Sequence, residues 1–312
     1  MRAFARRLRG RLLIGASWLA CRLPEGPLVR LADVAGDLWY RAAPDRAAQA
    51  RRNLRRVVTA LAADGRGDRR IQAAAADPRA LERLVRLAFR HNARYYLEVA
   101  RTPSIRPGEV DRLMAVETPD IVEEAFGEGP PVIFVGLHFG SLEIPSLFLA
   151  ERVGGAVAPM ETIDDAALQA YFIRTRGAAG VRIVGLREAR RELMSALREG
   201  TAVGVVGDRD LTGGGVLIRL FGSPAKLPLG PAMLAVESGA RPYVVGVRRV
   251  GVGQYVGRLE RIAVPADGSR RERVTATMVE LAGAFERIVE TAPEQWWAVF
   301  FPIWPDLEGT AA

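Results

Sequence analysis

The chain contains very few of the residues that bind metals through sulfur or imidazole. Among its 312 residues, Cys21 is the only cysteine, and His91 and His138 are the only histidines. A single cysteine excludes an intrachain disulfide and a cysteine-based zinc site. Because the two histidines stand far apart in the sequence, we expect no metal site.

The N-terminus lacks an apolar run long enough to span a bilayer. The stretch "MRAFARRLRGRLLIGASWLACR" has no acidic residue, and its uncharged run, Leu12–Cys21, is ten residues long. A membrane span needs about 20 apolar residues. A cleaved signal peptide stays open as an alternative, because Ala16 and Ala20 resemble the small residues of a cleavage site.

We interpret residues 1–22 instead as a basic amphipathic helix that lies on an anionic bilayer. Apolar residues at helical spacing form one face, and arginines surround it: Phe4, Leu8, Leu12, Ile14 and Trp18, with Arg2, Arg6, Arg7, Arg9 and Arg11. The alternative is a helix packed on the protein body with solvated arginines. The net charge of +8 fits an anionic partner.

The pattern of apolar residues divides the chain into two parts. Helical spacing recurs in Leu28–Arg41, Arg46–Ala62 and Ala80–Ala100, so residues 1–105 are predicted to be a helical N-terminal portion. From Pro130 onward, short β-branched runs alternate with helical patterns. This alternation predicts an α/β fold with a mostly parallel central sheet flanked by helices, within one continuous core of residues 106–312.

The stretch "VIFVGLHFGSLE" carries the first candidate for chemistry. His138 follows the predicted strand Val132–Leu137, and functional groups of α/β sheets gather at the carboxyl ends of strands. Glu143 falls in the first turn of the next predicted helix. A carboxylate on one ring nitrogen would leave the other nitrogen as a base for deprotonating an alcohol. The alternative role for Glu143 is to complement the helix dipole.

Two kinds of site motif are absent from the sequence. There is no G-x-S-x-G nucleophile elbow, so His138 is expected to activate a hydroxyl of a substrate rather than a serine of the protein. There is also no P-loop and no G-x-G-x-x-G motif. A nucleotide or dinucleotide cofactor is therefore not expected.

Further polar residues follow other predicted strands and helices. In "VGDRDLTGGG", Asp208 could orient His138, and Arg209 could contact a substrate; the alternative is an Asx turn before a glycine loop. Arg176 in "YFIRTRG" and Lys226, the only lysine, are candidates for binding an anion. Solvated surface residues are the alternative for both.

Together these stretches resemble the bacterial late acyltransferases of the lipid A lauroyl and myristoyl type. Within that family they look most like the branch of phosphatidylinositol mannoside acyltransferases. The matching stretches are "RRNLRRV" (51–57), "HFGSLE" (138–143), "RTRGAAGVRIV" (174–184), "GDRDLTGGGVLIRLFGSPAKLPLGPAMLAVESGA" (207–240) and "WWAVFFPIWPD" (296–306). They cover most of the chain.

The resemblance implies a glycerolipid acyltransferase-like fold and a peripheral protein on the cytoplasmic face of the inner membrane. It also implies transfer of a fatty acyl chain from acyl-CoA or acyl carrier protein to a hydroxyl of a membrane glycolipid, without a cofactor. By position, His138 matches the base, Glu143 the acid of the H-x4-[DE] motif, Asp208 a relay acid and Arg176 a substrate-binding arginine. Glu143 is the choice of the lipid A branch, so a lipid A-type acceptor stays open.

We expect the acyl chain to lie in an apolar groove beside the histidine, with Phe139, Ile144, Leu147 and Phe148 as candidates; ordinary core residues are the alternative. A lipid hydrolase or thioesterase that uses water is the second enzyme hypothesis. A basic membrane- or nucleic-acid-binding module is the third hypothesis, but only 7% aromatic residues, without clustering, argues against nucleic acid as a partner.

Overall fold

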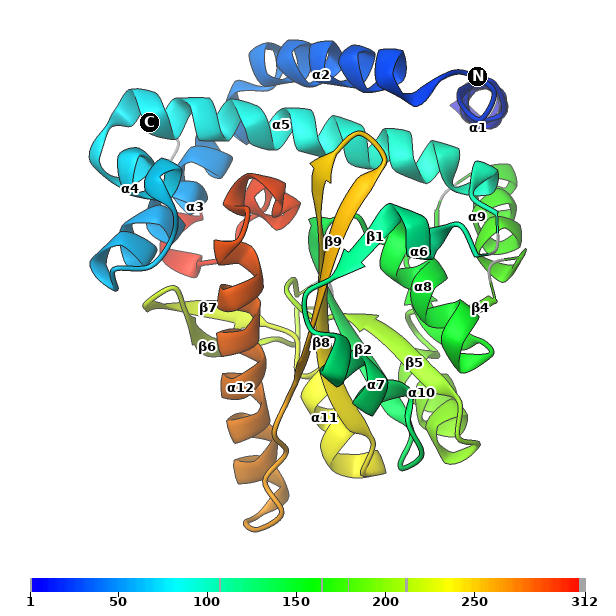
Figure 1. Cartoon of the computed structure of the whole chain (residues 1–312), viewed down its shortest axis with the longest axis vertical. Helices are drawn as coiled ribbons and strands as arrows, with labels where there is room; N and C mark the ends of the chain where they lie inside the picture. The colour runs from blue at the N-terminus through cyan, green and yellow to red at the C-terminus, as the bar shows by residue number, and fades with distance from the viewer. Residues whose placement is uncertain (1, 107, 164, 179, 211–212, 309–312) are drawn as a thin grey trace.

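A computed structural model describes residues 2–106, 108–163, 165–178, 180–210 and 213–308, with 2–9 and 150 described by their backbone alone. Within this part, a seven-stranded sheet has the order β1-β9-β8-β2-β5-β3-β4. Helices cover the sheet, and a layer of long helices lies across one end of it (Figure 1). The prediction of an α/β fold with a helical N-terminal portion is confirmed.

The strands of the main sheet pair in parallel, except for β8 and β9, which are antiparallel. The central β2 therefore has a parallel neighbour on each side, β8 and β5. The prediction of a mostly parallel sheet is confirmed. The strands are β1 (Met114–Val116), β2 (Val132–Gly140), β3 (Ala156–Met160), β4 (Val181–Gly185), β5 (Ala202–Val206), β8 (Arg241–Gly251) and β9 (Gln254–Arg261), and β6 (Val216–Leu220) and β7 (Ser223–Leu227) form a separate antiparallel hairpin.

Capping residues mark the starts of several helices in the N-terminal helical portion. Asp68 and Asp77 each accept hydrogen bonds from backbone amides of the helix that follows, and Pro44 and Pro78 stand at first helical positions. Helix α5 ends at Arg101, close to the predicted limit at residue 105. The helices are α1 (Arg2–Ala20), α2 (Glu25–Ala42), α3 (Pro44–Ala63), α4 (Arg69–Ala76) and α5 (Pro78–Arg101).

The helices of the α/β part connect the strands. They are α6 (Val110–Leu113), α7 (Pro119–Phe126), α8 (Glu143–Val153), α9 (Ala166–Ala178), α10 (Ala189–Arg198), α11 (Gly230–Ser238) and α12 (Arg270–Glu290), and the short 3₁₀ turns are η1 (Thr102–Ser104), η2 (Pro293–Gln295), η3 (Trp297–Phe300) and η4 (Pro305–Leu307). Strand β2 runs three residues further than predicted, so it includes His138, and the next helix starts at Glu143 rather than near Ser141.

The alternation of side chains along β2 separates two apolar cores. Ile133, Val135, Leu137 and Phe139 belong to the larger core, and Val132 and Phe134 belong to a smaller one beside α8. The pairing of β2 with β8 is irregular between Gly136 and Gly140, so regular alternation does not extend to His138. The contacts of its ring are with Asp208 and Trp297.

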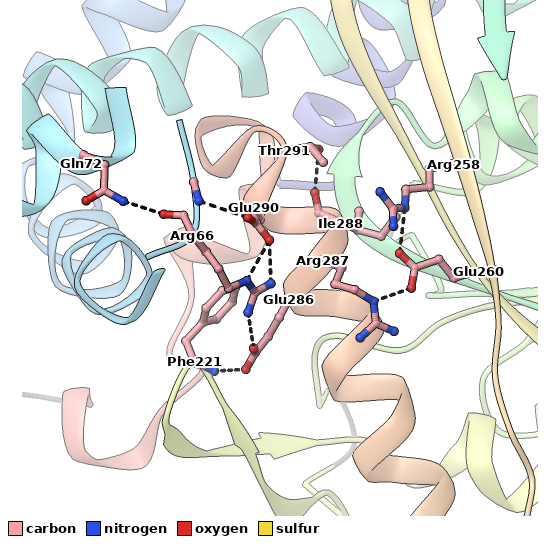
Figure 2. A network of polar contacts seen from close by, with 11 residues as sticks. Arg66, Gln72, Phe221, Arg258, Glu260, Glu286, Arg287, Ile288, Glu290 and Thr291 are labelled. Atoms are coloured by element: carbon pink, nitrogen blue, oxygen red, sulfur yellow. Dashed lines mark hydrogen bonds and ion pairs between the residues drawn. The ribbon is translucent and has the colours of Figure 1, made fainter. Parts of the chain in front are cut away.

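Helix α12 ties the helical portion to the α/β part through ion pairs (Figure 2). Arg66, which follows α3, bonds to Glu286 and Glu290 of α12, and Glu286 also accepts the backbone amide of Phe221. The Phe221 ring in turn lies 6.1 Å from that of Trp296. The network therefore supports the aromatic layer behind the strand that carries His138.

Candidate active site

His138 and Asp208 form a hydrogen-bonded pair at the carboxyl ends of two neighbouring strands. Strands β2 and β5 are parallel and pair up to Gly136 and Val206, so the residues two positions further along meet. Nδ1 of His138 lies 2.7 Å from Oδ1 of Asp208, and the backbone amide of His138 donates to Oδ2 at 2.9 Å. The Asp208 side chain is fully buried, and that of His138 is 13% exposed.

The surroundings of Asp208 keep it ionised. Burial would raise the pKa of its carboxyl, but the charge and hydrogen bonds of His138, with a 2.7 Å bond from the indole of Trp296, leave that pKa below its usual value. An ionised carboxylate accepts a hydrogen bond from the N–H at Nδ1, so Nε2 carries the lone pair. In the described part of the chain, no group hydrogen-bonds to Nε2.

A tryptophan next to Trp296 holds the imidazole from the side. The rings of Trp297 and His138 meet edge to face, with centroids 4.4 Å apart at 77°. On its other side Trp297 stacks on Tyr95 of α5, with centroids 4.7 Å apart. No role was predicted for this tryptophan pair, although two adjacent tryptophans out of five in the chain were a signal.

Glu143 pairs with Arg176 rather than with the histidine. Its Oε1 lies 2.8 Å from Nη2 of Arg176, and the Glu143 side chain is 6% exposed. Burial lowers the pKa of the Arg176 guanidinium, but Glu143 raises it more, so the arginine stays charged. This corrects our prediction that Glu143 bonds to the imidazole: Asp208 occupies Nδ1, and α8 directs Glu143 toward the last turn of α9.

The model of the family "Bacterial lipid A biosynthesis acyltransferase" matches residues 6–302. The chain belongs to that family. It is an acyltransferase, and the predicted family resemblance is confirmed.

Relatives of this acyltransferase carry a more specific name. A phosphatidylinositol mannoside acyltransferase of Mycolicibacterium smegmatis is 27% identical over 252 residues, which are 80% of this chain and 76% of the relative. An enzyme of the same name from Mycobacterium tuberculosis is 29% identical over 233 residues, 72% of this chain and 68% of the relative. The predicted similarity to the mannoside branch is thus confirmed.

A groove of about 790 Å³ runs between the sheet and α8 and reaches the Glu143–Arg176 pair. Phe134 and Gly136 of β2, the second of them two residues before His138, line it. Gly136 and Gly204 keep this face of the sheet open. Further lining comes from apolar residues of the strands and of α8, among them Leu142, Leu149, Val181, Ile183 and Val206.

The four residues that we predicted for an acyl groove are buried elsewhere. Phe139 lies on the opposite face of β2, where it bridges to Trp296 in the larger core. Ile144, Leu147 and Phe148 belong to the smaller core and border three other cavities. None of the four borders the 790 Å³ groove, and a role for them in an acyl groove stays a prediction.

The predicted anion-binding residues differ in their surroundings. The Arg209 guanidinium lies 3.5 Å from the centre of the Phe301 ring, and Arg46 lies over the same ring at 4.8 Å. Burial lowers the pKa of Arg209, while Glu161 and Asp208 offset part of that effect. Lys226 donates to the Gly213 carbonyl at 3.1 Å, an arrangement that favours a loop anchor over a substrate contact.

Two kinds of feature are absent from the described residues. No group of three or more histidine, cysteine, aspartate or glutamate side chains there is arranged to hold a metal ion. No helix in the described part of the acyltransferase is both long and apolar enough to cross a membrane.

Proposed function

We propose that this acyltransferase moves a fatty acyl chain from acyl-CoA or acyl carrier protein to a hydroxyl of a membrane glycolipid, a phosphatidylinositol mannoside. The observation that carries the proposal is the His138–Asp208 pair, which leaves Nε2 without a partner among the described residues. The names of the relatives support the acceptor. A lipid A-type acceptor is the second candidate, favoured by Glu143 in the H-x4-[DE] motif.

In this proposal His138 is the general base. Nε2 accepts the proton of the acceptor hydroxyl as its oxygen attacks the thioester carbonyl. Asp208, fully buried beside Nδ1, stabilises the imidazolium that forms. As the C–S bond breaks, the imidazolium returns the proton to the leaving thiolate. No cofactor enters this scheme, and the base is expected to contribute about 10²–10⁴-fold in rate.

The arginines near the site take separate parts in the proposed reaction. Arg176, kept charged by Glu143, lies at the end of the groove and would bind the carbonyl region of the acyl group or the headgroup. The guanidinium groups of Arg209 and Arg46 both lie against the Phe301 ring. We assign these two arginines to a phosphate of donor or acceptor, which guanidinium groups bind well.

The groove between the sheet and α8 is the proposed place of the acyl chain. Its lining is mostly apolar, and its polar end is formed by Glu143 and Arg176. Gly136 of its lining stands two residues before His138 on β2, so a chain in the groove would have its carbonyl end near the base.

We propose that helices α1 and α2 rest on the anionic inner membrane, on its cytoplasmic face. On α2, Gly36 packs against Arg90 of α5, and the opposite side exposes Leu31 and Leu38. On α1, Leu12 is 64% and Trp18 is 58% exposed, which matches the apolar face predicted there. The side chains of Phe4, Leu8 and the arginines before residue 10 lie outside the described residues.

The decisive experiment is a transfer assay with purified protein, radiolabelled palmitoyl-CoA and lipids that contain phosphatidylinositol mannosides. The wild type should label the glycolipid, and His138→Ala and Asp208→Asn should each lose about 10²–10⁴-fold in kcat. Near-normal transfer by folded His138→Ala would refute the mechanism. Rapid release of free fatty acid without any glycolipid would favour the hydrolase, and labelling of lipid A precursors would favour the second acceptor.

A further inference from the structure

The chain makes a sharp turn two residues after His138. Gly140 has φ +52°, and a Cβ there would lie 1.8 Å from the carbonyl oxygen of Val247 on β8. The next amide, that of Ser141, donates to the same carbonyl at 3.0 Å. The end of β2 is therefore pressed against β8, and only glycine fits this close approach.

A buried arginine on β8 holds the carbonyl of this turn. Nη2 of Arg249 donates to the Gly140 oxygen at 2.7 Å and to Glu98 of α5 at 2.7 Å, and its Nε also donates to Glu98. The hydroxyl of Tyr255 donates to Glu98 at 3.0 Å. The Arg249 and Glu98 side chains are 5% and 13% exposed, so water does little to screen their charges.

The same arginine is joined to the segment that holds Asp208. Its backbone amide donates to Gln295 at 2.8 Å, and the Gln295 side-chain amide donates back to the Arg249 carbonyl at 2.9 Å. Gln295 directly precedes Trp296, whose indole donates to Asp208. Arg249 thus contacts the turn after His138 on one side and the support of Asp208 on the other.

This pair is poorly suited to stabilising the fold alone. Both charged groups are removed from water, and the free-energy cost of this desolvation offsets much of what their attraction contributes to stability. In addition, Nη1 of Arg249 is buried without a partner in the described part of the chain. Arg248, the next residue toward the N-terminus, makes an ordinary pair with Glu117 at 2.6 Å near the surface. The contrast points to placement of the turn as the task of Arg249.

We propose that Arg249, held by Glu98, is a positioning residue for acyl transfer. This inference rests on the proposed role of His138 as the base. The guanidinium fixes the Gly140 carbonyl, and through two residues of strand it fixes where Nε2 stands relative to Asp208 and the substrate. Without the guanidinium, the Gly140 oxygen loses its Arg249 donor, Glu98 keeps only the Tyr255 hydroxyl, and the end of β2 relaxes. A shift of about 1 Å at the base costs about 100-fold in rate.

The test compares Arg249→Gln with Arg249→Lys, and uses Arg248→Gln as the matched control on the same strand. We expect folded Arg249→Gln to lose about 100-fold in kcat with KM within about twofold, because the misplaced group is the base and not a substrate contact. A lysine can donate to Gly140 or Glu98, so Arg249→Lys should recover part of the rate. Arg248→Gln should match the wild type.

The second readout follows the His138 imidazole itself. The Nδ1 proton bonded to Asp208 gives a downfield proton NMR signal, assigned by its loss in His138→Gln. This signal should shift or broaden in Arg249→Gln and not in Arg248→Gln. An unchanged signal with a raised KM would show a binding role and overturn the proposal. If the wild type transfers no acyl chain, the proposed function fails. The NMR measurement still tests whether Arg249 places the His138 imidazole.

A milder variant covers the case in which Arg249→Gln does not fold. Tyr255→Phe removes only the hydroxyl that donates to Glu98. It should lower kcat by a few-fold and leave KM almost unchanged. The NMR signal of the Nδ1 proton should move in the same direction as in Arg249→Lys. Wild-type kcat and an unmoved signal in both Tyr255→Phe and Arg249→Lys would overturn the proposal.

Discussion

The indole nitrogen of Trp296 lies 2.7 Å from Oδ2 of Asp208, and neither side chain is exposed to solvent. The two residues stand 88 positions apart in the chain and meet behind the imidazole. Asp208 thereby accepts three hydrogen bonds, from Trp296 and from the ring and backbone of His138. The acid that orients the base is itself held in place from the C-terminal segment.

Trp296→Phe should therefore reduce turnover. The change removes the indole N–H that donates to Oδ2 of Asp208. The loss of this hydrogen bond raises the pKa of Asp208 and weakens its hydrogen bond to His138. We expect kcat to fall by roughly tenfold and the free energy of unfolding by about 1–3 kcal/mol. Steady-state kinetics and urea unfolding measure the two effects.

Trp304→Phe is the matched control for Trp296. Its indole is equally buried and donates to the Leu220 carbonyl at 3.1 Å, far from the histidine in the hydrogen-bond network. It should lose similar stability and keep its kcat. Equal losses of kcat in both variants would mean that Trp296 supports the fold and not the acid.

Much of this fold was predictable because apolar spacing reports burial directly. The pattern of Ala80–Ala100 gave α5, and the run "VIFVGL" gave β2 with His138 at its end. Some elements had no such signal: β1 has three residues, and the hairpin strand β7 carries Pro224, which is tolerated only at an edge. Short strands with broken alternation look like loops in a sequence.

The partners within the site were less predictable than its central histidine. Asp208 was predicted because it follows an apolar strand, and in the structure this strand neighbours β2. Glu143 was assigned to the wrong partner, since the spacing H-x4-E does not say which way α8 turns the side chain. Arg249 carried no signal, because almost all of the 44 basic residues are arginines and burial alone distinguishes this one.

The Glu143–Arg176 pair should behave as one unit. Both side chains are largely removed from solvent, at 6% and 24% exposure. Glu143→Gln leaves the arginine without its counter-charge, so each single variant should lose most of what the double variant loses. A double-mutant cycle on kcat/KM should give a coupling of about 1–3 kcal/mol. Arg174→Gln, two residues away on the same helix and exposed, should be neutral. Additive losses would show that Glu143 acts independently of Arg176.

Gly136 should set how much acyl chain the groove accepts. A Cβ at this position would meet its nearest neighbours at 3.8–4.0 Å, so alanine fits without displacing the fold. Larger side chains would extend into the groove, and Gly136→Leu should shift the preference from palmitoyl-CoA toward shorter donors. Competition between acyl-CoA mixtures, read by mass spectrometry of the product, measures this. Gly230→Ala, with open space around its Cβ, is the control. An unchanged chain-length profile in Gly136→Leu would place the acyl chain elsewhere.

The exposed apolar residues of α1 and α2 should carry membrane binding. Replacing Trp18 and Leu31 by serine removes apolar area that would enter the interface, at about 25 cal/mol per Å². We expect the double variant to float poorly with vesicles rich in phosphatidylinositol, and wild-type flotation to weaken with salt. Leu217→Ser is the control, since Leu217 is 61% exposed on β6, at a distance from α1 and α2 (Figure 1). Flotation of Trp18/Leu31 variants equal to that of Leu217→Ser would remove these helices from the membrane contact.

His91 should make the fold sensitive to mild acid. Burial, with the charges of Arg249, Arg94 and Arg70, lowers the pKa of its imidazole from 6.5 to about 3. Between these values the unfolded chain binds a proton that the folded chain does not, so stability rises with pH there. The stability is complete above pH 6.5 and falls as the pH drops toward 3, by at most about 1.4 kcal/mol per pH unit.

His91→Gln should flatten this pH dependence between pH 6.5 and 4.5, where buried carboxylates with lowered pKa values, such as that of Asp208, have not yet titrated. Urea unfolding at several pH values in this window measures the slope. A wild-type slope in His91→Gln would show that another group is the acid-sensitive one.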